Sequence, residues 1–367
     1  MFAVTCTRTD PDNPLAGLTL GEHPDPEPRE GWATVAVKAT ALNHHDLWTL
    51  QGVGIRQDRL PIVLGCDAAG VDEDGNEVIV HSVIGTPVHG DETLDPRRSL
   101  LSEVHDGTFA ERVAVPRGNL VPKPAELSFE DAACLPTAWL TAYRMLFEKA
   151  GLEPGSTVLV QGAGGGVATA LITLGRAAGY RVWATSRSEG KRARALELGA
   201  DQVFTPGARL PERVDAVMET VGQATWDHSL KSLRPGGRVV VSGATSGAVP
   251  PADLNRVFFL QLSVVGSTMG TREQLARLAT FLGQTGVRPV VDQGAAAGQG
   301  RRGLRRAAGR RVLREDRLHR RLTPGRATEV SGAPRRGSWW SRRTARPARP
   351  PGSPRSPCPP PRAPGCP

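Results

Sequence analysis

Long apolar runs are missing from this sequence. No stretch of about 18 consecutive apolar residues, the length that spans a bilayer, occurs in its 367 residues. The amino terminus turns polar within Met1–Thr5, so no apolar segment of signal-peptide length forms there. We therefore expect neither a membrane-spanning nor a secreted protein, but a cytoplasmic one.

Cysteine is scarce and scattered. The five cysteines are an odd number and lie far apart, at Cys6, Cys66, Cys134, Cys358 and Cys366. A small disulfide-linked fold needs an even and clustered set. The pattern therefore excludes that class and favours a reducing compartment.

Lysine is absent from the last 75 residues, where arginine supplies all the positive charge. Residues 293–367 hold 19 arginines, three acidic residues and 12 of the 31 prolines, for a formal charge of +16. The preceding 292 residues hold 27 basic and 34 acidic residues, a formal charge of −7. This composition predicts a disordered Arg/Pro-rich tail that, taken at face value, suits nucleic acid. Regularly spaced aromatic residues are lacking, because Trp339 and Trp340 stand alone, so we do not expect nucleic-acid binding.

A glycine cluster in the middle of the chain is the most informative motif present. The β-branched run Thr157–Val160 leads into Gly162–Gly166 and then into a helical apolar segment, 167–178. Glycines let a backbone approach a pyrophosphate, and the free N–H groups of a first helical turn face its charge. The spacing allows two registers, one with Val167 in the third glycine position and one that runs from Ala163 to Ala168. A tight turn without a ligand is the alternative.

The end of the next predicted strand, 180–185, indicates which nucleotide binds. An NAD site usually has an acidic residue there, roughly 20 residues past the glycines. This chain has Ser186, Arg187 and, shortly after, Lys191, which suit the 2′-phosphate of NADPH. An ordinary solvated helix start is the alternative.

Strand-like and helical segments then alternate, which predicts a doubly wound parallel sheet, an α/β fold. Strands are expected at 214–219, 238–243 and 261–266, and helices at 224–233 and 252–259. Ligands of such sheets lie at the carboxyl ends of the strands. The predicted cofactor contacts are Thr137, Ala163, Gly164, Gly165, Gly166, Val167, Ser186, Arg187, Lys191, Gly222, Gly243, Ala244 and Ser267.

The first 120 or so residues have short strand-like runs, at 33–39, 77–83 and 110–115, and no long amphipathic helix. With the glycine loop, this outline resembles the medium-chain dehydrogenase/reductase superfamily, and within it the zinc-free quinone-oxidoreductase-like branch. The segments that carry the resemblance are 41–48, 64–70, 107–111, 138–143, 162–168, 243–247 and 266–270. The resemblance implies a β-rich GroES-like catalytic domain at 1–126, a Rossmann NADPH-binding domain at 127–266 and a return segment at 267–292. It also implies a possible homodimer.

Many relatives carry a catalytic zinc, held by Cys, His and Cys from three segments with a carboxylate beside the His. Here Asn43 stands at the first of these positions, Cys66-Asp67 at the second and Thr137 at the third. One potential thiolate and two neutral oxygens make a poor zinc site. Residues 79–106 also lack the four cysteines of the structural zinc lobe. We therefore expect no metal, and read His44, His45, His81 and His89 as surface or hydrogen-bonded residues.

Without zinc, the chemistry must come from the cofactor. A hydride from NADPH can pass to an electron-poor quinone or to the β-carbon of an enone, if the protein orients the acceptor and stabilises the oxygen that gains charge. We assign the orienting role to Asn43, with Asp46 shaping the pocket, whereas Trp48 is expected to pack in the core. Asn43 has an alternative as a plain turn residue. A zinc-dependent alcohol dehydrogenase and a non-catalytic nucleotide-sensing or nucleic-acid-binding protein are the alternative functions.

The tail itself is interpreted as a frame-shifted translation. The family resemblance stops after Val287–Asp292, where relatives continue into a closing helix and a terminal strand. Arg, Ala, Gly and Pro codons are GC-rich, as an out-of-frame reading of a GC-rich gene requires. Back-translation from Gln293, read one base later, is compatible with phrases that end this family and with a stop near Leu322. We predict that the chain as printed is unstable or poorly active.

Overall fold

The computed structural model describes residues 1–291 of the chain. All of the described residues belong to one compact unit of the chain. Our predictions of a disordered tail and of a shifted frame therefore lie outside the described residues. Among residues 1–291, no helix is long and apolar enough to cross a membrane.

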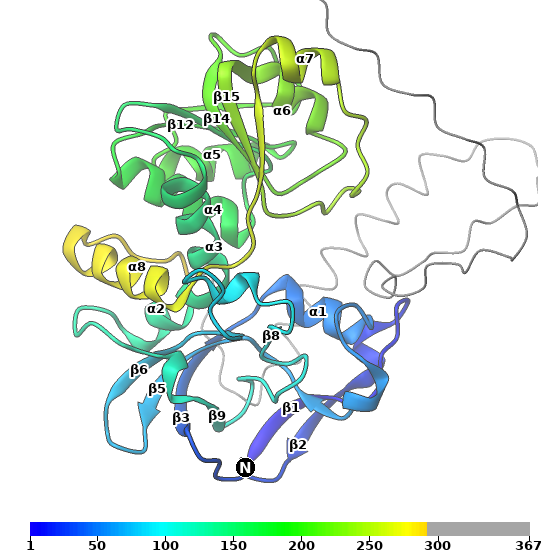
Figure 1. The fold of residues 1–367 in the computed structure, drawn as a ribbon, viewed down its shortest axis with the longest axis vertical. Helices are drawn as coiled ribbons and strands as arrows, with labels where there is room; N and C mark the ends of the chain where they lie inside the picture. The colour runs from blue at the N-terminus through cyan, green and yellow to red at the C-terminus, as the bar shows by residue number, and fades with distance from the viewer. Residues whose placement is uncertain (292–367) are drawn as a thin grey trace, which may run out of the picture. The chain divides into compact units, whose positions relative to one another are not determined.

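Short antiparallel strands make up the first third of the chain, which we call the β-rich part (Figure 1, blue to cyan). They form a five-stranded sheet in the order β10-β6-β5-β3-β9, a three-stranded sheet in the order β2-β1-β4, and the pair β7-β8. The strands are β1 Phe2–Cys6, β2 Leu18–Glu22, β3 Trp32–Ala41, β4 Ile62–Val63, β5 Asp67–Asp72, β6 Glu77–Val80, β7 Val83–Ile84, β8 Ser99–Leu100, β9 Arg112–Pro116 and β10 Leu120–Pro122. The α-helix of this part, α1 (His44–Leu50), is short, as expected.

Alternating side chains explain how this sheet forms its core. Along β9, Val113 and Val115 are buried while their neighbours are not. Val35 of β3 lies opposite Val113 in antiparallel register, and both belong to one hydrophobic cluster. The period of two places one face of the sheet inward, as an antiparallel sheet with one solvated face requires.

Six parallel strands form the second large sheet, which we call the Rossmann sheet (Figure 1, green to yellow). Its order, β13-β12-β11-β14-β15-β16, is the 3-2-1-4-5-6 order of a dinucleotide-binding sheet, so the predicted doubly wound fold is confirmed. The strands are β11 Thr157–Val160, β12 Arg181–Thr185, β13 Gln202–Phe204, β14 Val214–Glu219, β15 Leu233–Val241 and β16 Ser263–Gly266. The helices are α4 Gly166–Ala177, α5 Glu189–Glu197, α6 Trp226–Ser232 and α7 Leu254–Phe259.

β16 begins two residues later than predicted, and larger differences from the prediction occur at β15 and β13. β15 begins at Leu233, because the turn of Pro235, Gly236 and Gly237 lies within it as an irregularity of the register against β14. β13 has three residues, too few for a periodic signal, and the sequence did not predict it.

A run of short helices connects the β-rich part to the Rossmann sheet. It comprises α2 Phe129–Ala133, η5 Leu135–Trp139, α3 Leu140–Tyr143 and η6 Arg144–Lys149. η5 and η6 are π-helical, a rare conformation that is frequent at functional sites. After the sheet, α8 (Arg272–Thr285) packs against α3 and β10, and His81 Nε2 lies 3.0 Å from the backbone oxygen of Gly270. The predicted domain limits at 126, 266 and 292 stay predictions.

Candidate active site and cofactor loop

The glycine loop follows β11 and ends where α4 begins. Gly162 and Gly164 have φ angles of 79° and 107°, which glycine adopts without strain. Gly165 is the N-cap of α4, and a Cβ built there meets no atom within 4 Å. The first turn of α4, including Gly166 and Val167, therefore begins beside open space. Its backbone N–H groups suit an anionic pyrophosphate.

The end of β12 holds this loop in place. The backbone oxygen of Thr185 accepts a hydrogen bond from the N–H of Ala163, at 2.7 Å. Its hydroxyl accepts from the N–H of Gly162, at 3.2 Å, and donates to Gln161 Oε1, at 2.7 Å. Contacts within the protein therefore help to hold the loop in its conformation.

The residues predicted to select the nucleotide lie next to the loop. Ser186 is buried, and its Oγ accepts from the N–H of Ser188 at 3.3 Å, while Arg187 is exposed. The Lys191 side chain lies over Gly164, where an added Cβ would come within 2.7 Å of Lys191 Cδ. Two cationic side chains therefore flank the position that follows β12, and no carboxylate occupies residues 186–188.

The remaining predicted cofactor contacts lie on turns after β14, β15 and β16. Gly222 has a φ of 88° and donates its N–H to Glu219 Oε1 at 3.0 Å, so turn geometry alone explains this glycine. Gly243 and Ala244 begin the neighbouring turn, and a Cβ built on Gly222 would come within 2.9 Å of Ala244 Cα. The hydroxyl oxygen of Ser267 is buried and has no hydrogen-bond partner among the described residues. Of these four residues, Ser267 offers the clearest unused polar group.

A buried carboxyl joins the β-rich part to the connecting helices. Asp67, the first residue of β5, is 1% exposed. Its Oδ2 accepts from Asn43 Nδ2 at 2.8 Å, and its Oδ1 accepts from Thr137 Oγ1 at 2.5 Å. We call these three residues the Asp67 centre. Asn43 and Thr137 are both partly exposed, and Ala138, the neighbour of Thr137, lies against Gly166 of the cofactor loop.

No positively charged group is among the main contacts that shift the pKa of Asp67. Burial raises the pKa of Asp67 to about 7, against hydrogen bonds from Thr137 and Asn43 that lower it. The Asp46 carboxylate adds to the upward shift of this pKa. A carboxyl with such a pKa can hold or release a proton near neutral pH.

Asp46 is fully buried on the first turn of α1. Its Oδ2 accepts from the N–H of Asn43 at 2.7 Å, which fixes the start of the helix, and its Oδ1 has no partner among the described residues. Burial raises the pKa of Asp46 to about 6. These contacts are those of a residue that positions Asn43; a catalytic role for Asp46 stays a prediction.

The prediction for Trp48 was wrong. It was expected in the core, but its side chain is 37% exposed, with its ring 6.2 Å from that of His44. On α1 the buried positions are Asp46, Leu47, Thr49 and Leu50, so the helical period turns Trp48 outward. The tryptophan therefore lies on the surface of this helix.

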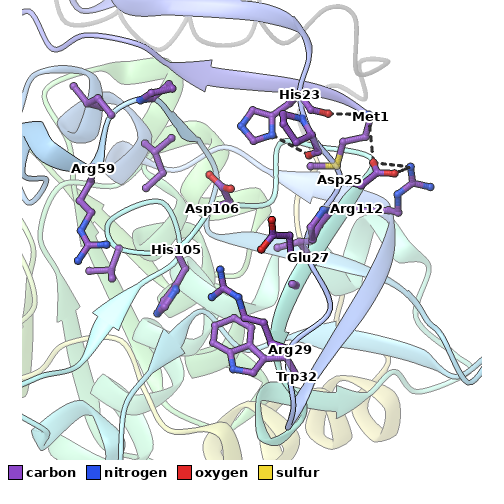
Figure 2. Close-up of a pocket in the computed structure, with 18 of the residues that line it drawn as sticks. Met1, His23, Asp25, Glu27, Arg29, Trp32, Arg59, His105, Asp106 and Arg112 are labelled. Atoms are coloured by element: carbon purple, nitrogen blue, oxygen red, sulfur yellow. Dashed lines mark hydrogen bonds and ion pairs between the residues drawn. The ribbon is translucent and has the colours of Figure 1, made fainter.

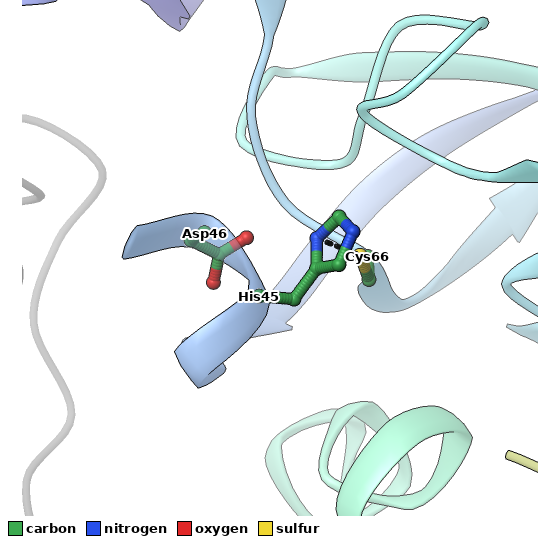
Figure 3. A group of neighbouring side chains, drawn as sticks. All are labelled: His45, Asp46 and Cys66. Carbon is green, nitrogen blue, oxygen red and sulfur yellow. Dashed lines mark hydrogen bonds between the residues drawn. The ribbon is translucent and has the colours of Figure 1, made fainter. Parts of the chain in front are cut away.

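The Cys66 side chain contacts His45 (Figure 3). Its Sγ lies 3.1 Å from His45 Nδ1 and 3.3 Å from the oxygen of Leu101, and His45 Nε2 lies 3.0 Å from Glu103 Oε1. Burial raises the pKa of the Cys66 thiol, which keeps it protonated. Burial opposes a charge on His45, but Cys66 and Glu103 raise its pKa well above the usual value. Cys66, His45 and Glu103 thus form a chain of hydrogen-bond contacts on this side of α1.

A surface cavity of about 470 Å³ lies elsewhere in the β-rich part (Figure 2). Among its lining residues, His105 lies edge-on to Trp32, and Arg29 stacks over the same ring at 5.1 Å from its centroid. None of the predicted site residues lines it. The cavity is therefore separate from the Asp67 centre and from the glycine loop.

Asp67 was not among the predicted site residues. It was named only with Cys66, at the second of the three zinc positions. Its two partners are 24 and 70 residues away along the chain, so no local pattern joins them. The signal that was available is chemical: an aspartate within an otherwise apolar strand start, 64–69, needs partners if it is buried.

Two sequence families match this chain. Residues 29–125 match one described as an alcohol dehydrogenase GroES-like domain, and residues 166–284 match one described as a zinc-binding dehydrogenase. An acryloyl-coenzyme A reductase of Metallosphaera sedula is 33% identical over 300 residues, covering 75% of this chain and 88% of that protein. A quinone oxidoreductase of Lama guanicoe is 27% identical over 285 residues, covering 72% and 82%. A solved NAD-dependent alcohol dehydrogenase has a TM-score of 0.73 at 35% identity, covering 82% of this chain and 95% of that one.

The zinc in the second description can be tested against the donor set. At the Asp67 centre, the amide of Asn43 and the hydroxyl of Thr137 direct N–H and O–H groups at Asp67, and Cys66 points toward His45 instead. Zinc requires lone pairs from three such groups at one point. Asn43, Asp67 and Thr137 therefore do not fit a catalytic zinc. His45, Asp46 and Cys66 do bring ligand atoms within 4.8 Å of one another, but the imidazole and thiol already share a hydrogen bond.

Proposed function

This chain belongs to the medium-chain dehydrogenase/reductase superfamily of oxidoreductases, and from that membership we propose that it is an NADPH-dependent reductase of quinones or activated alkenes that works without zinc. The observation that carries the proposal is the Asp67 centre. It replaces a metal donor set with hydrogen-bond donors and lies next to the residue that contacts the cofactor loop. The similarity to an acryloyl-coenzyme A reductase and to a quinone oxidoreductase supports this acceptor class.

The cofactor would supply the hydride, and the chain's own residues would bind and orient. Ala163–Val167 would hold the pyrophosphate on the N-terminal turn of α4. Ser186, Arg187 and Lys191 support NADPH over NADH, because a 2′-phosphate there would meet positive charge. The unused Ser267 hydroxyl suits a polar group of the nucleotide. The solved relative whose description names NAD makes NADH the alternative cofactor.

Asn43 would orient the acceptor. One of its two amide hydrogens is engaged by Asp67, and its second contact, to the oxygen of Ala41, is 3.5 Å and weak. The second N–H is therefore available to an acceptor oxygen that gains negative charge after hydride transfer. Its position as the N-cap of α1, held by Asp46, limits how far the amide can move.

A homodimer is part of the proposal. β16 is the edge strand of the Rossmann sheet, and Val264 on it is 51% exposed. Phe258 and Phe259 on the preceding helix α7 are 58% and 76% exposed. An exposed edge strand beside apolar side chains supports association of two copies.

Turnover assays on the full chain test this function. We expect oxidation of NADPH, faster than of NADH, with a benzoquinone or with an α,β-unsaturated thioester, and no effect of a chelator. An Asn43→Ala variant should lose about 10-fold to 100-fold in kcat, as typical for removal of one donor to a developing oxyanion. Asn13→Ala, on an exposed turn, is the matched control.

The alternatives predict different results. Oxidation of a simple alcohol that requires added zinc would replace the proposal with an alcohol dehydrogenase. Tight NADPH binding without turnover on any acceptor would favour a nucleotide sensor.

A further inference from the structure

The Asp67 centre holds one residue that binding and orientation do not need. A carboxyl is not required to hold an amide in place, since a backbone oxygen would do so without burying a titratable group. Asp67 is nevertheless fully buried, between two side chains that are partly exposed. The hydrogen bond to Thr137 therefore connects this buried carboxyl to a partly exposed hydroxyl. Thr137 lies on the π-helical turn η5, beside the cofactor loop.

We propose that Asp67 and Thr137 form a proton relay, in which the Asp67 carboxyl supplies, through the Thr137 hydroxyl, the proton that the reduced acceptor takes up. The proposal rests on the proposed reductase function. Thr137 Oγ1 lies 2.5 Å from Asp67 Oδ1, close enough for a proton to pass directly between the two oxygens. No other carboxyl of the described residues is hydrogen-bonded to either Asn43 Nδ2 or Thr137 Oγ1.

The step balances in protons and electrons. Hydride addition to the β-carbon of an enone breaks the C=C π bond and leaves an enolate, which needs one proton. When Asp67 is protonated on Oδ1, the hydrogen bond runs from Asp67 to Thr137 Oγ1, and the Thr137 O–H is turned to the acceptor. The Thr137 O–H bond then breaks to give that proton, while Thr137 Oγ1 takes the proton from Asp67, and the carboxylate accepts from Thr137 as in the structure. Asp67 is left as a carboxylate, which Thr137 and Asn43 stabilise by donating to its two oxygens. Water returns the proton before the next turnover, so no further reductant or oxidant enters.

The groups that face Asp67 support a carboxyl that is protonated near neutral pH. Asp46, from α1, carries the charge that adds to the upward shift of the Asp67 pKa. Cys66, which precedes Asp67, and Cys134, which precedes η5, are thiols whose pKa values burial raises, so they are neutral near pH 7. Ser82, after β6, is a neutral donor at 3.5 Å from Oδ1. Burial raises the pKa of Asp67 to about 7, which lets it both donate and regain a proton at that pH.

Three variants test the relay. Thr137→Val removes the hydroxyl and keeps the shape, Thr137→Ser restores it, and Asp67→Asn removes the proton source. Thr141→Val, a buried hydroxyl one turn further along, is the control, because Thr141 does not contact Asp67. We expect Thr137→Val and Asp67→Asn to lower kcat by at least 10-fold and to abolish its fall above pH 7. Thr137→Ser and Thr141→Val should retain both the rate and the pH profile.

A second readout does not depend on turnover. Infrared difference spectra of wild type against Asp67→Asn should show a protonated carboxyl that disappears as the pH rises through about 7. Because Thr137 stabilises the carboxylate, Thr137→Val should move this transition to higher pH.

Two results overturn the relay while leaving the reductase in place: a Thr137→Val enzyme with wild-type kcat and pH profile, or an Asp67 that is ionised at pH 6. A wild-type enzyme that reduces no quinone or enone would instead overturn the proposed function, and with it the destination of the proton. The infrared transition would then still show whether Asp67 holds a proton. The two failures are therefore distinguishable.

Discussion

The Rossmann sheet and the β-rich part carry their functional residues in different ways. Around the Rossmann sheet, the cofactor residues follow one another in the chain, on the turn between β11 and α4 and directly after β12. In the β-rich part, the Asp67 centre combines residues 43, 67 and 137, which only tertiary folding brings together. The first arrangement is a backbone shape, and the second is a set of side-chain contacts. Substitutions should therefore break them differently.

The glycine loop should give the largest loss. Gly164 has a φ of 107°, and a Cβ there would lie 2.7 Å from Lys191 Cδ, so Gly164→Val strains the turn and displaces the lysine. We expect at least a 100-fold weaker NADPH affinity, measured by quenching of protein fluorescence. Gly190→Ala in α5, where a Cβ meets nothing within 4 Å, is the matched control and should bind normally. Equal binding by both variants would show that the loop does not hold the nucleotide.

Removing the positive charge of Arg187, which follows β12, should have the next largest effect on nucleotide binding. Arg187→Ala removes a guanidinium that only a 2′-phosphate would use, so NADPH affinity should fall by about 10-fold to 100-fold while NADH affinity stays unchanged. Arg209→Ala, also an exposed arginine of this region, should change neither affinity. A parallel loss for both nucleotides would assign Arg187 to general electrostatics rather than to nucleotide choice.

The two regions also differ in how far the sequence predicted them. Strands such as β14, with its continuous run from Val214 to Glu219, are fixed by local composition, and their predicted bounds hold. Asp67 and Trp48 were missed because their environment depends on distant residues or on which face of a short helix is covered. Asn43 was predicted as a site residue, but its hydrogen bond to Asp67 was not predicted. The two residues are 24 positions apart, and no sequence pattern indicates a contact over that distance.

The buried carboxyls predict a smaller effect on stability, with a definite sign. The pKa of Asp67 is raised to about 7 and that of Asp46 to about 6, so folding favours their protonated forms. Their contribution to the free energy of unfolding is therefore greatest below about pH 4, the usual range for aspartate, and is lost as the pH rises through 6 and 7. Asp67→Asn should remove part of this pH dependence. The free energy of unfolding of the variant minus that of wild type should therefore be about 1–2 kcal/mol more favourable to the variant at pH 8 than at pH 5.

Urea unfolding of both proteins at pH 5, 6, 7 and 8 measures this difference. Asp72→Asn is the control. Burial of Asp72 is outweighed by hydrogen bonds from Asn76, which lower its pKa. The effect of Asp72→Asn on the free energy of unfolding should therefore change with pH only in the acid range, below pH 5. A difference between Asp67→Asn and wild type that does not change with pH would show that Asp67 is already ionised at pH 5.

Metal removal should have the smallest effect, namely none. In the Asp67 centre, Asn43 and Thr137 present hydrogens where a zinc ion would need lone pairs. We expect less than about 0.1 zinc per chain by elemental analysis after purification, and unchanged NADPH oxidation after treatment with a chelator.

Stoichiometric zinc would contradict this expectation, and a variant would then locate it. Among residues 1–291, Cys66 is the one thiol whose Sγ lies with ligand atoms of His45 and Asp46 within 4.8 Å, so zinc lost on Cys66→Ser would place the ion in that group. Cys6→Ser, at another buried cysteine, is the matched control. Zinc at Cys66 would break the hydrogen bond between Cys66 and His45 but leave the Asp67 centre intact. The β-rich part would then combine a metal group and a separate proton-carrying carboxyl on opposite sides of the Cys66–Asp67 peptide.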